Sequence, residues 1–169
     1  MYIREKAEED CYSQKWLRKK YIGIKRGELK RYQARIARVA GDYELEEGVY
    51  LIPHKAAQLE RAGLRAGMYR RTGRHWRPDD FSHEQSLVFE TQKGLVIFNS
   101  CSHGGVEVII REVMDTFPGQ PIYAMLGGFH LFHKPEAEVR SLARKIQSTG
   151  VEKIYTGHCT GEKAFQILR

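Results

Sequence analysis

The sequence predicts an α/β fold in which strands and helices alternate along the later half of the chain. Short apolar runs of strand length occur there at Leu95–Phe98, Ile122–Leu126 and Lys153–Tyr155. Apolar residues at helical spacing lie between and after these runs, and such an alternation is typical of layered α/β domains. One domain is the expectation for a chain of 169 residues.

The earlier half, residues 1–78, is expected to be a basic helix and loop region of the same domain, with its boundary near Asp79. Apolar residues at helical spacing predict a helix over Glu28–Ala40. A stretch rich in Gly and Arg predicts a long loop with little helix. Two short strands and this loop complete the half: Tyr21–Ile24, Val49–Ile52 and His54–Pro78.

Residues 79–169 are expected to form a β-hairpin followed by a βαβα arrangement. Two β-rich runs, Ser86–Phe89 and Leu95–Phe98, are joined by a Gly-containing turn, which predicts the hairpin. The spacing of apolar residues, with Pro and Gly at the boundaries, predicts the helices and strands that follow the hairpin. In chain order these elements are a helix over Val106–Phe117, a strand at Ile122–Leu126, a helix from about Pro135 to Gly150, a strand at Lys153–Tyr155 and a helix at Glu162–Leu168.

The composition is that of a folded, water-soluble protein. Hydrophobic residues make up 41% of the chain and the mean hydropathy is −0.53, which argues against a disordered chain and a membrane-embedded one. The charged start does not resemble a secretion signal, so a cytoplasmic location is expected. Three widely spaced cysteines without C-x-x-C spacing favour reduced thiols over a disulfide scaffold.

The chain is basic, with 28 Lys and Arg against 21 Asp and Glu and a formal charge of +7. Most of the surplus lies in Lys15–Arg38 and Arg61–Arg77. Such a run can bind phosphate-rich polymers, but a solvated face is the simpler interpretation. Because no recognised nucleic-acid module accompanies it, nucleic acid is not expected as a partner. A small anionic or phosphorylated substrate is expected instead.

Three strand exits in the later half share one design, in which an apolar strand is followed by small residues and a histidine. The histidines are His103, His130 and His158. Carboxyl ends of parallel strands meet at one edge of an α/β sheet, so these imidazoles are expected to converge. A catalytic zinc site needs about three protein ligands and an open position. The sequence therefore predicts a divalent metal site, with zinc as the first candidate and manganese or iron as alternatives.

The other histidines and two cysteines have simpler interpretations. Any single exit histidine, taken alone, is more often a hydrogen-bonded structural residue. Cys101 and Cys159 are expected to be small buried filler, because no flanking base argues for a nucleophile. Four further histidines in polar or loop settings are expected at the surface: His54, His75, His83 and His133.

Three motifs surround the exit histidines: Asn-Ser-Cys-Ser-His-Gly-Gly at 99–105, Leu-Gly-Gly-Phe-His-Leu at 126–131 and Thr-Gly-His-Cys-Thr-Gly at 156–161. In this order and spacing they resemble a branch of the metallo-β-lactamase-fold hydrolases. It is the branch of metal-dependent hydrolases similar to dihydropterin ribofuranosylaminobenzene phosphate synthase. Residues 80–87 and the following hairpin also resemble it, so the likeness covers about residues 79–168.

The resemblance implies the C-terminal half of an αββα sandwich with a one- or two-metal site at its rim. In that family a metal-bound hydroxide attacks an ester, phosphoester or similar bond. His103 matches the histidine that completes the first metal's shell, and His158 matches the late histidine of the second. His130 lies where many members place a bridging aspartate, so it is either a terminal ligand or a hydrogen-bond donor to one.

The family's main ligand motif, H-x-H-x-D-H, does not occur between Met1 and Arg169. The sequence therefore resembles the later part of a larger hydrolase, and loss of the other half would expose apolar sheet faces. A homo-oligomer, or association with the missing N-terminal half, is expected. Two functions remain open: a metal-dependent hydrolase, and a non-catalytic remnant or partner subunit that retains the scaffold.

Overall fold

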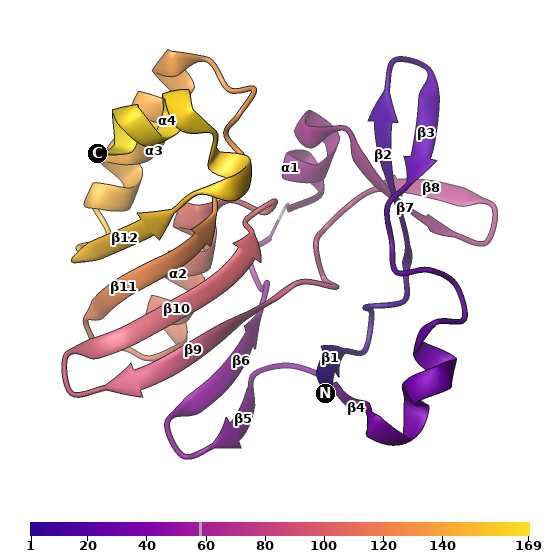
Figure 1. The fold of residues 1–169 in the computed structure, drawn as a ribbon, viewed down its shortest axis with the longest axis horizontal. Helices are drawn as coiled ribbons and strands as arrows, with labels where there is room; N and C mark the ends of the chain where they lie inside the picture. The colour runs from indigo at the N-terminus through magenta and orange to yellow at the C-terminus, as the bar shows by residue number, and fades with distance from the viewer. Residues whose placement is uncertain (58) are drawn as a thin grey trace. The chain divides into compact units, whose positions relative to one another are not determined.

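Two compact units make up the computed structural model, which describes residues 1–57 and 59–169. The first unit consists of residues 1–43 and 53–85, and the second of residues 44–52 and 86–169. Each unit contains its own hydrogen-bonded sheet (Figure 1).

The first unit is built on a four-stranded antiparallel sheet of order β3-β2-β7-β8 and a parallel pair of β1 with β4. A short 3-10 helix and one α-helix accompany these strands. The bounds are β1 (Tyr2–Arg4), β2 (Asp10–Lys15), β3 (Arg18–Tyr21), η1 (Leu29–Arg35), β4 (Ala37–Val39), α1 (Leu59–Ala66), β7 (Met68–Thr72) and β8 (His75–Pro78).

The second unit is built on a six-stranded sheet of order β12-β11-β10-β9-β6-β5. Strand β10 is antiparallel to β9 and parallel to β11, and β11 is parallel to β12. The bounds are β5 (Tyr43–Glu46), β6 (Val49–Pro53), β9 (Gln85–Thr91), β10 (Gly94–Cys101), α2 (Val106–Thr116), β11 (Ile122–Gly128), α3 (Glu136–Gln147), β12 (Lys153–Thr156), η2 (His158–Thr160) and α4 (Glu162–Leu168).

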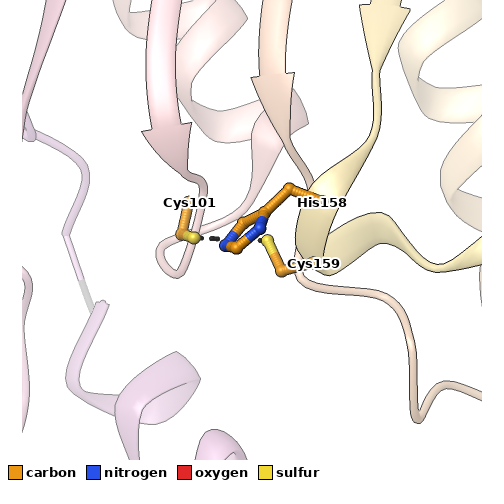
Figure 2. A group of neighbouring side chains, drawn as sticks. All are labelled: Cys101, His158 and Cys159. Atoms are coloured by element: carbon orange, nitrogen blue, oxygen red, sulfur yellow. Dashed lines mark hydrogen bonds between the residues drawn. The ribbon is translucent and has the colours of Figure 1, made fainter.

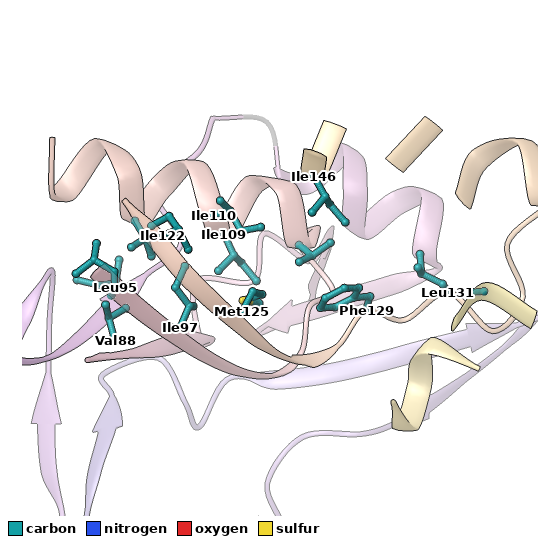
Figure 3. Close-up of a cluster of buried hydrophobic side chains, with 14 of the residues drawn as sticks. Val88, Leu95, Ile97, Ile109, Ile110, Ile122, Met125, Phe129, Leu131 and Ile146 are labelled. Carbon is teal, nitrogen blue, oxygen red and sulfur yellow. The ribbon is translucent and has the colours of Figure 1, made fainter. Parts of the chain in front are cut away.

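The core of the second unit lies between one face of this sheet and its helices (Figure 3). Ile110 of α2 and Ile146 of α3 belong to this core, and both are at least 98% buried. Burial of each such side chain stabilises the fold by about 1.5 to 3 kcal/mol. The strand register lines up one core residue from each of four strands: Val88, Ile97, Met125 and Ile154.

The opposite face of the same four strands carries a second apolar row, which we call the open-face row: Leu87, Phe98, Leu126 and Tyr155. Phe98 is 39% exposed and Tyr155 is 55% exposed. Successive residues of a strand point to opposite faces, so each open-face residue is the chain neighbour of a core residue. Helices α2, α3 and α4 all contribute to the core on the first face.

The elements predicted after Asp79 are confirmed. The hairpin, the helix after it and the two later strands lie within three residues of their predicted ends. Pro135 directly precedes α3, and α4 spans the predicted residues Glu162–Leu168. Of the strands predicted earlier, Val49–Ile52 is confirmed as β6. The strand predicted at Tyr21–Ile24 is wrong, because only its first residue lies in a strand, as the last residue of β3.

The helix predicted over Glu28–Ala40 is wrong in type and length. Only the 3-10 helix η1 forms, and Ile36 after it is extended, with φ −112° and ψ 123°. The following strand β4 pairs in parallel with β1, and the N–H of Ala37 donates to the carbonyl of Met1 at 2.9 Å. This pairing joins segments more than thirty residues apart, so local apolar spacing could not predict it.

The long loop predicted for His54–Pro78 is also wrong, because α1, β7 and β8 form there. The strands were not predicted because their many Arg residues interrupt the alternation of apolar and polar residues that indicates a strand. Arg70 on β7 is held by carboxylates of Asp80, Glu60 and Glu9 at 2.7, 3.3 and 3.7 Å. Arg71 lies over the Trp76 ring, 5.5 Å from its centroid, across the β7–β8 hairpin. Among the described residues, no helix is long and apolar enough to cross a bilayer.

Replacing Ile110 by Ala should lower the free energy of unfolding by about 2 to 5 kcal/mol, because this buried side chain would leave a cavity. Met114, one turn later on α2, is 36% exposed. Met114→Ala is the matched control and should cost less than about 1 kcal/mol. Chemical denaturation followed by circular dichroism measures both losses, and equal losses would contradict a core on the Ile110 side of α2.

Candidate metal centre

The three exit histidines follow three adjacent parallel strands. His103 follows β10, His130 follows β11, and His158 follows β12 as the first residue of η2. Because the strands are parallel, their carboxyl ends lie at one edge of the sheet. The rings of His103 and His130 meet edge to face, with their centroids 4.8 Å apart.

Two cysteines join this group from the first and third exits (Figure 2). The Cys159 thiol donates to the sulfur of Cys101 at 3.3 Å. The donor atoms of Cys101, His158 and Cys159 all lie within 4.8 Å of one another. The sulfur of Cys159 also accepts the backbone N–H of His130 at 3.3 Å. The edge therefore carries two side-chain groups: the His103 and His130 rings in contact with each other, and His158 with Cys101 and Cys159. The backbone N–H of His130 joins the two groups through the sulfur of Cys159.

Backbone hydrogen bonds fix the three exits to one another. The N–H of Ser102 donates to the carbonyl of Gly128 at 2.8 Å, which joins the first exit to the second. The N–H of Phe129 donates to the hydroxyl of the fully buried Thr160 at 2.9 Å, which joins the second to the third. The N–H of Leu131 donates to the carbonyl of Cys159 at 3.0 Å.

His130 and His158 both have left-handed backbone conformations, with φ of 52° and 50°. A non-glycine residue there costs of order 1 kcal/mol or more and persists only where its surroundings impose it. The hydrogen bonds between the exits impose it here. Strain of this kind is concentrated at functional sites, and in this chain it falls on two of the three predicted ligands.

Gly128 allows the third exit to approach β11 closely. A Cβ atom at this position would lie 2.6 Å from the sulfur of Cys159 and 3.0 Å from the carbonyl oxygen of Ser100. An open pocket of about 400 Å³ lies at the same edge, and His158, Tyr155 and Cys101 are among its lining residues. A small molecule can therefore reach the cluster from solvent.

Comparisons with known proteins support this architecture. No family model matches the chain. A Methanocaldococcus jannaschii protein named 7,8-dihydropterin-6-methyl-4-(β-D-ribofuranosyl)-aminobenzene-5′-phosphate synthase is 37% identical over 86 residues, which are 51% of this chain and 29% of the relative. The crystal structure of Tm1679, described as a metal-dependent hydrolase of the β-lactamase superfamily, superposes with a TM-score of 0.80 and 28% identity.

The match to Tm1679 covers 98% of this chain and 62% of that structure. The chain has the metallo-β-lactamase fold. The α/β class and the family resemblance predicted from the sequence are thus confirmed. The chain spans less than two thirds of the length of each of these two proteins, so their whole-protein activities are not transferred to it.

The structure places all three predicted ligands at one edge of this metallo-β-lactamase fold, and their role as ligands stays a prediction. The sequence analysis did not predict that Cys101 and Cys159 belong to the candidate metal centre. Both are half-buried and close to His158, not fully buried filler. The signal was present, because Cys101 lies two residues before His103 and Cys159 directly follows His158.

Two of the four histidines expected at the surface are exposed as predicted, His75 and His133. The prediction is wrong for His54, whose side chain is only 3% exposed and whose Nε2 lies 3.6 Å from a carboxylate oxygen of Glu84. It is also wrong for His83, whose side chain is 22% exposed and lies against Cys11 and Asp79. Tertiary packing in the first unit buries these rings, which their polar sequence neighbours did not indicate.

Gly128→Ala should lower the free energy of unfolding by about 1 to 3 kcal/mol, because the added methyl group would overlap the Cys159 sulfur. Gly157→Ala is the matched control. Gly157 has an extended backbone, and a Cβ there would meet no atom within 4 Å, so little change is expected.

The double variant Gly128→Ala with Cys159→Ala should recover part of the loss, because it removes the sulfur atom that the methyl group meets. Urea denaturation measures all four proteins with the wild type as reference. If Gly128→Ala is tolerated as well as Gly157→Ala, the close approach of the second and third exits is contradicted.

Proposed function

We propose that this chain is a metal-dependent hydrolase of the metallo-β-lactamase superfamily, in which His103, His130 and His158 hold a divalent metal, with zinc as the first candidate. The observation that supports this most is that the three histidines follow three adjacent parallel strands, with the His103 and His130 rings in contact and His158 grouped with Cys101 and Cys159. The likeness to Tm1679 supports the reaction class.

The donors present at this edge suit zinc. Imidazole nitrogen and thiol sulfur are both good zinc ligands, whereas magnesium and calcium prefer oxygen. The edge offers the three histidines, and Cys101 and Cys159 lie close enough to His158 to bind a metal beside it. Hydrogen bonds between the exits hold the backbones of His130 and His158 in place before any ion binds.

A divalent metal held there would supply the Lewis acidity that activates water and polarises an ester or phosphoester oxygen. The chain's own residues would bind and orient the substrate. The pocket beside His158 is lined by Tyr155 and Ser100, whose hydroxyls can donate to a substrate oxygen. Its glycines at the second and third exits let a substrate approach the backbone closely.

The proposed substrate is a small anionic molecule with an ester or phosphoester bond. The net charge of +7 favours anionic ligands by raising their local concentration. The name of the archaeal relative contains a ribofuranosyl phosphate, so phosphorylated small molecules come first in a substrate screen. Neither nucleic acid nor a membrane is part of the proposal, and a cytoplasmic location remains the expectation.

Zinc or manganese should raise the melting temperature of the chelator-treated protein and support hydrolysis of bis(p-nitrophenyl) phosphate or p-nitrophenyl acetate. Binding at a hundred times the dissociation constant stabilises the folded state by about 2.7 kcal/mol. The double variant His103→Ala with His158→Ala should bind metal at least about tenfold more weakly and lose the hydrolytic activity.

His133→Ala is the matched control, since His133 is exposed and lies three residues after His130. It should retain both metal binding and activity. Wild-type protein with neither a metal-dependent stability change nor hydrolysis would overturn the proposal. That result would favour a non-catalytic remnant or partner subunit that keeps only the scaffold.

We also propose that the purified chain forms a homo-oligomer through the open-face row of its second unit. Exposed apolar rows of this kind favour association of sheets. Phe98→Lys should shift the population toward monomer, because it places a charge within the row, whereas Lys163→Ala on the exposed side of α4 should not. Light scattering measures the mass, and a wild-type monomer at all concentrations would contradict the proposal.

A further inference from the structure

A second group of metal-ligand side chains lies entirely within the first unit: Cys11 on β2, with Asp79 and His83 in the segment after β8. One donor atom from each residue lies within 4.8 Å of the others. Cys11 is 6% exposed and Asp79 is 2% exposed. The His83 side chain is 22% exposed, so the group is buried but can be reached along His83.

Both other donors face the same nitrogen of His83. Its Nδ1 lies 3.7 Å from the sulfur of Cys11 and 3.6 Å from Oδ1 of Asp79. A tetrahedral zinc ion with bonds of about 2.0 to 2.3 Å holds its ligand atoms about 3.3 to 3.6 Å apart. Both distances to His83 are therefore close to the ligand spacing of such a tetrahedron, and the Cys11 sulfur and the Asp79 oxygen lie within 4.8 Å of each other.

This arrangement differs from that of a catalytic triad. In a triad the nucleophile and the carboxylate contact opposite nitrogens of the imidazole, which relays the proton between them. Here the thiol and the carboxylate share Nδ1. The geometry is suited to an ion at the common point and not to activation of Cys11 as a nucleophile.

The other ring nitrogen of His83 faces a carboxylate. Its Nε2 lies 4.0 Å from one oxygen of Glu84, and the second oxygen of Glu84 lies 3.6 Å from Nε2 of His54. Histidine ligands commonly direct their remaining ring N–H to a carboxylate, which fixes the tautomer and leaves the first nitrogen free to bind. At 4.0 Å the Glu84 oxygen is beyond hydrogen-bond distance, so a small shift of either side chain would let Glu84 do this for His83.

The backbone after β8 holds Asp79 and His83 in position. The Asp79 carboxylate accepts the N–H of Phe81 at 2.9 Å, and the N–H of Glu84 donates to the Phe81 carbonyl at 2.9 Å. Phe81 is fully buried, with φ 53°. Helix α1 contacts the same segment closely, because a Cβ at Gly63 would lie 2.1 Å from the Asp79 carbonyl oxygen. The ligand set is thus preorganised.

Carboxylates lie near Cys11, although Arg70, its partner on β7, pairs with Glu9 and Asp80. Burial, together with the nearby Asp79 and Glu9 carboxylates, raises the pKa of the Cys11 thiol to about 12. The Asp79 carboxylate attracts a cation, whose binding to the Cys11 sulfur would release the thiol proton to solvent. A set of thiolate, imidazole and carboxylate ligands selects zinc over magnesium or calcium, which prefer oxygen ligands alone.

We propose that Cys11, Asp79 and His83 bind one zinc-class divalent cation in the first unit, through the Cys11 sulfur, a carboxylate oxygen of Asp79 and Nδ1 of His83. Water fills the fourth position on the side where His83 is exposed. The ion ties β2 to the segment after β8 and so stabilises this unit. The proposal is independent of the histidine cluster of the second unit.

A cobalt titration tests this site with a readout that the histidine cluster does not supply. The double variant Cys101→Ser with Cys159→Ser leaves Cys11 as the only thiol, since the chain has three cysteines. Added Co²⁺ should then produce the near-ultraviolet charge-transfer absorption of a thiolate–cobalt bond. In this background Cys11→Ser should abolish the band, and Asp79→Asn or His83→Gln should weaken binding at least about tenfold.

His75→Gln is the matched control, because His75 is an exposed histidine of the same unit and should leave the titration unchanged. Circular dichroism of the metal-free variants verifies that each is folded. In the wild type, zinc should also slow alkylation of Cys11 by iodoacetamide, relative to protein with excess chelator, as followed by mass spectrometry.

No thiolate–cobalt band at millimolar Co²⁺ in the background variant would overturn the proposal. A band that survives Cys11→Ser, or alkylation of Cys11 at the same rate with and without zinc, would overturn it as well. Loss of this site without loss of hydrolysis would leave the proposed function intact, so the two proposals fail separately.

Discussion

The parallel pairing of β10, β11 and β12 is the constraint on which the candidate metal centre depends. Three histidines separated by 27 and 28 positions in the chain lie at one edge only because these strands are parallel and adjacent. The register that aligns the core side chains of these strands also sets how far the carboxyl end of each strand extends at that edge. Packing of the core against α2 and α3 therefore determines where the imidazoles can lie.

Hydrogen bonds between the exits turn this proximity into a defined geometry. Thr160 is fully buried and accepts from the second exit, while the sulfur of Cys159 accepts from His130 and donates to Cys101. These contacts compensate for the left-handed backbones of His130 and His158. A centre whose ligands are held in this way loses little conformational entropy when an ion or a substrate binds.

Local sequence patterns predicted the second unit well, because its elements are long, apolar and bounded by Gly or Pro. Helix α2 and strand β11 are examples, and each carries enough apolar residues at one spacing to determine its type. The metallo-β-lactamase resemblance came from the same region. The exit histidines were predicted from strand polarity alone, but the contribution of Cys159 required the actual distance to Cys101.

The first unit resisted prediction for a physical reason. Its strands are short and rich in Arg and Lys, and its pairings join distant segments, as β1 does with β4. The group of Cys11, Asp79 and His83 is a consequence of the same long-range pairing. Positions 11 and 79 are too far apart in the chain for a local sequence pattern to predict that their side chains are neighbours.

The most direct test of the account is a crystal structure of the zinc-loaded protein, with anomalous diffraction locating the metal. The account predicts a peak in the second unit about 2.0 to 2.1 Å from imidazole nitrogens of His103, His130 and His158. Zinc bound in this unit away from those nitrogens, or no peak at the carboxyl edge of β10 to β12, would contradict it.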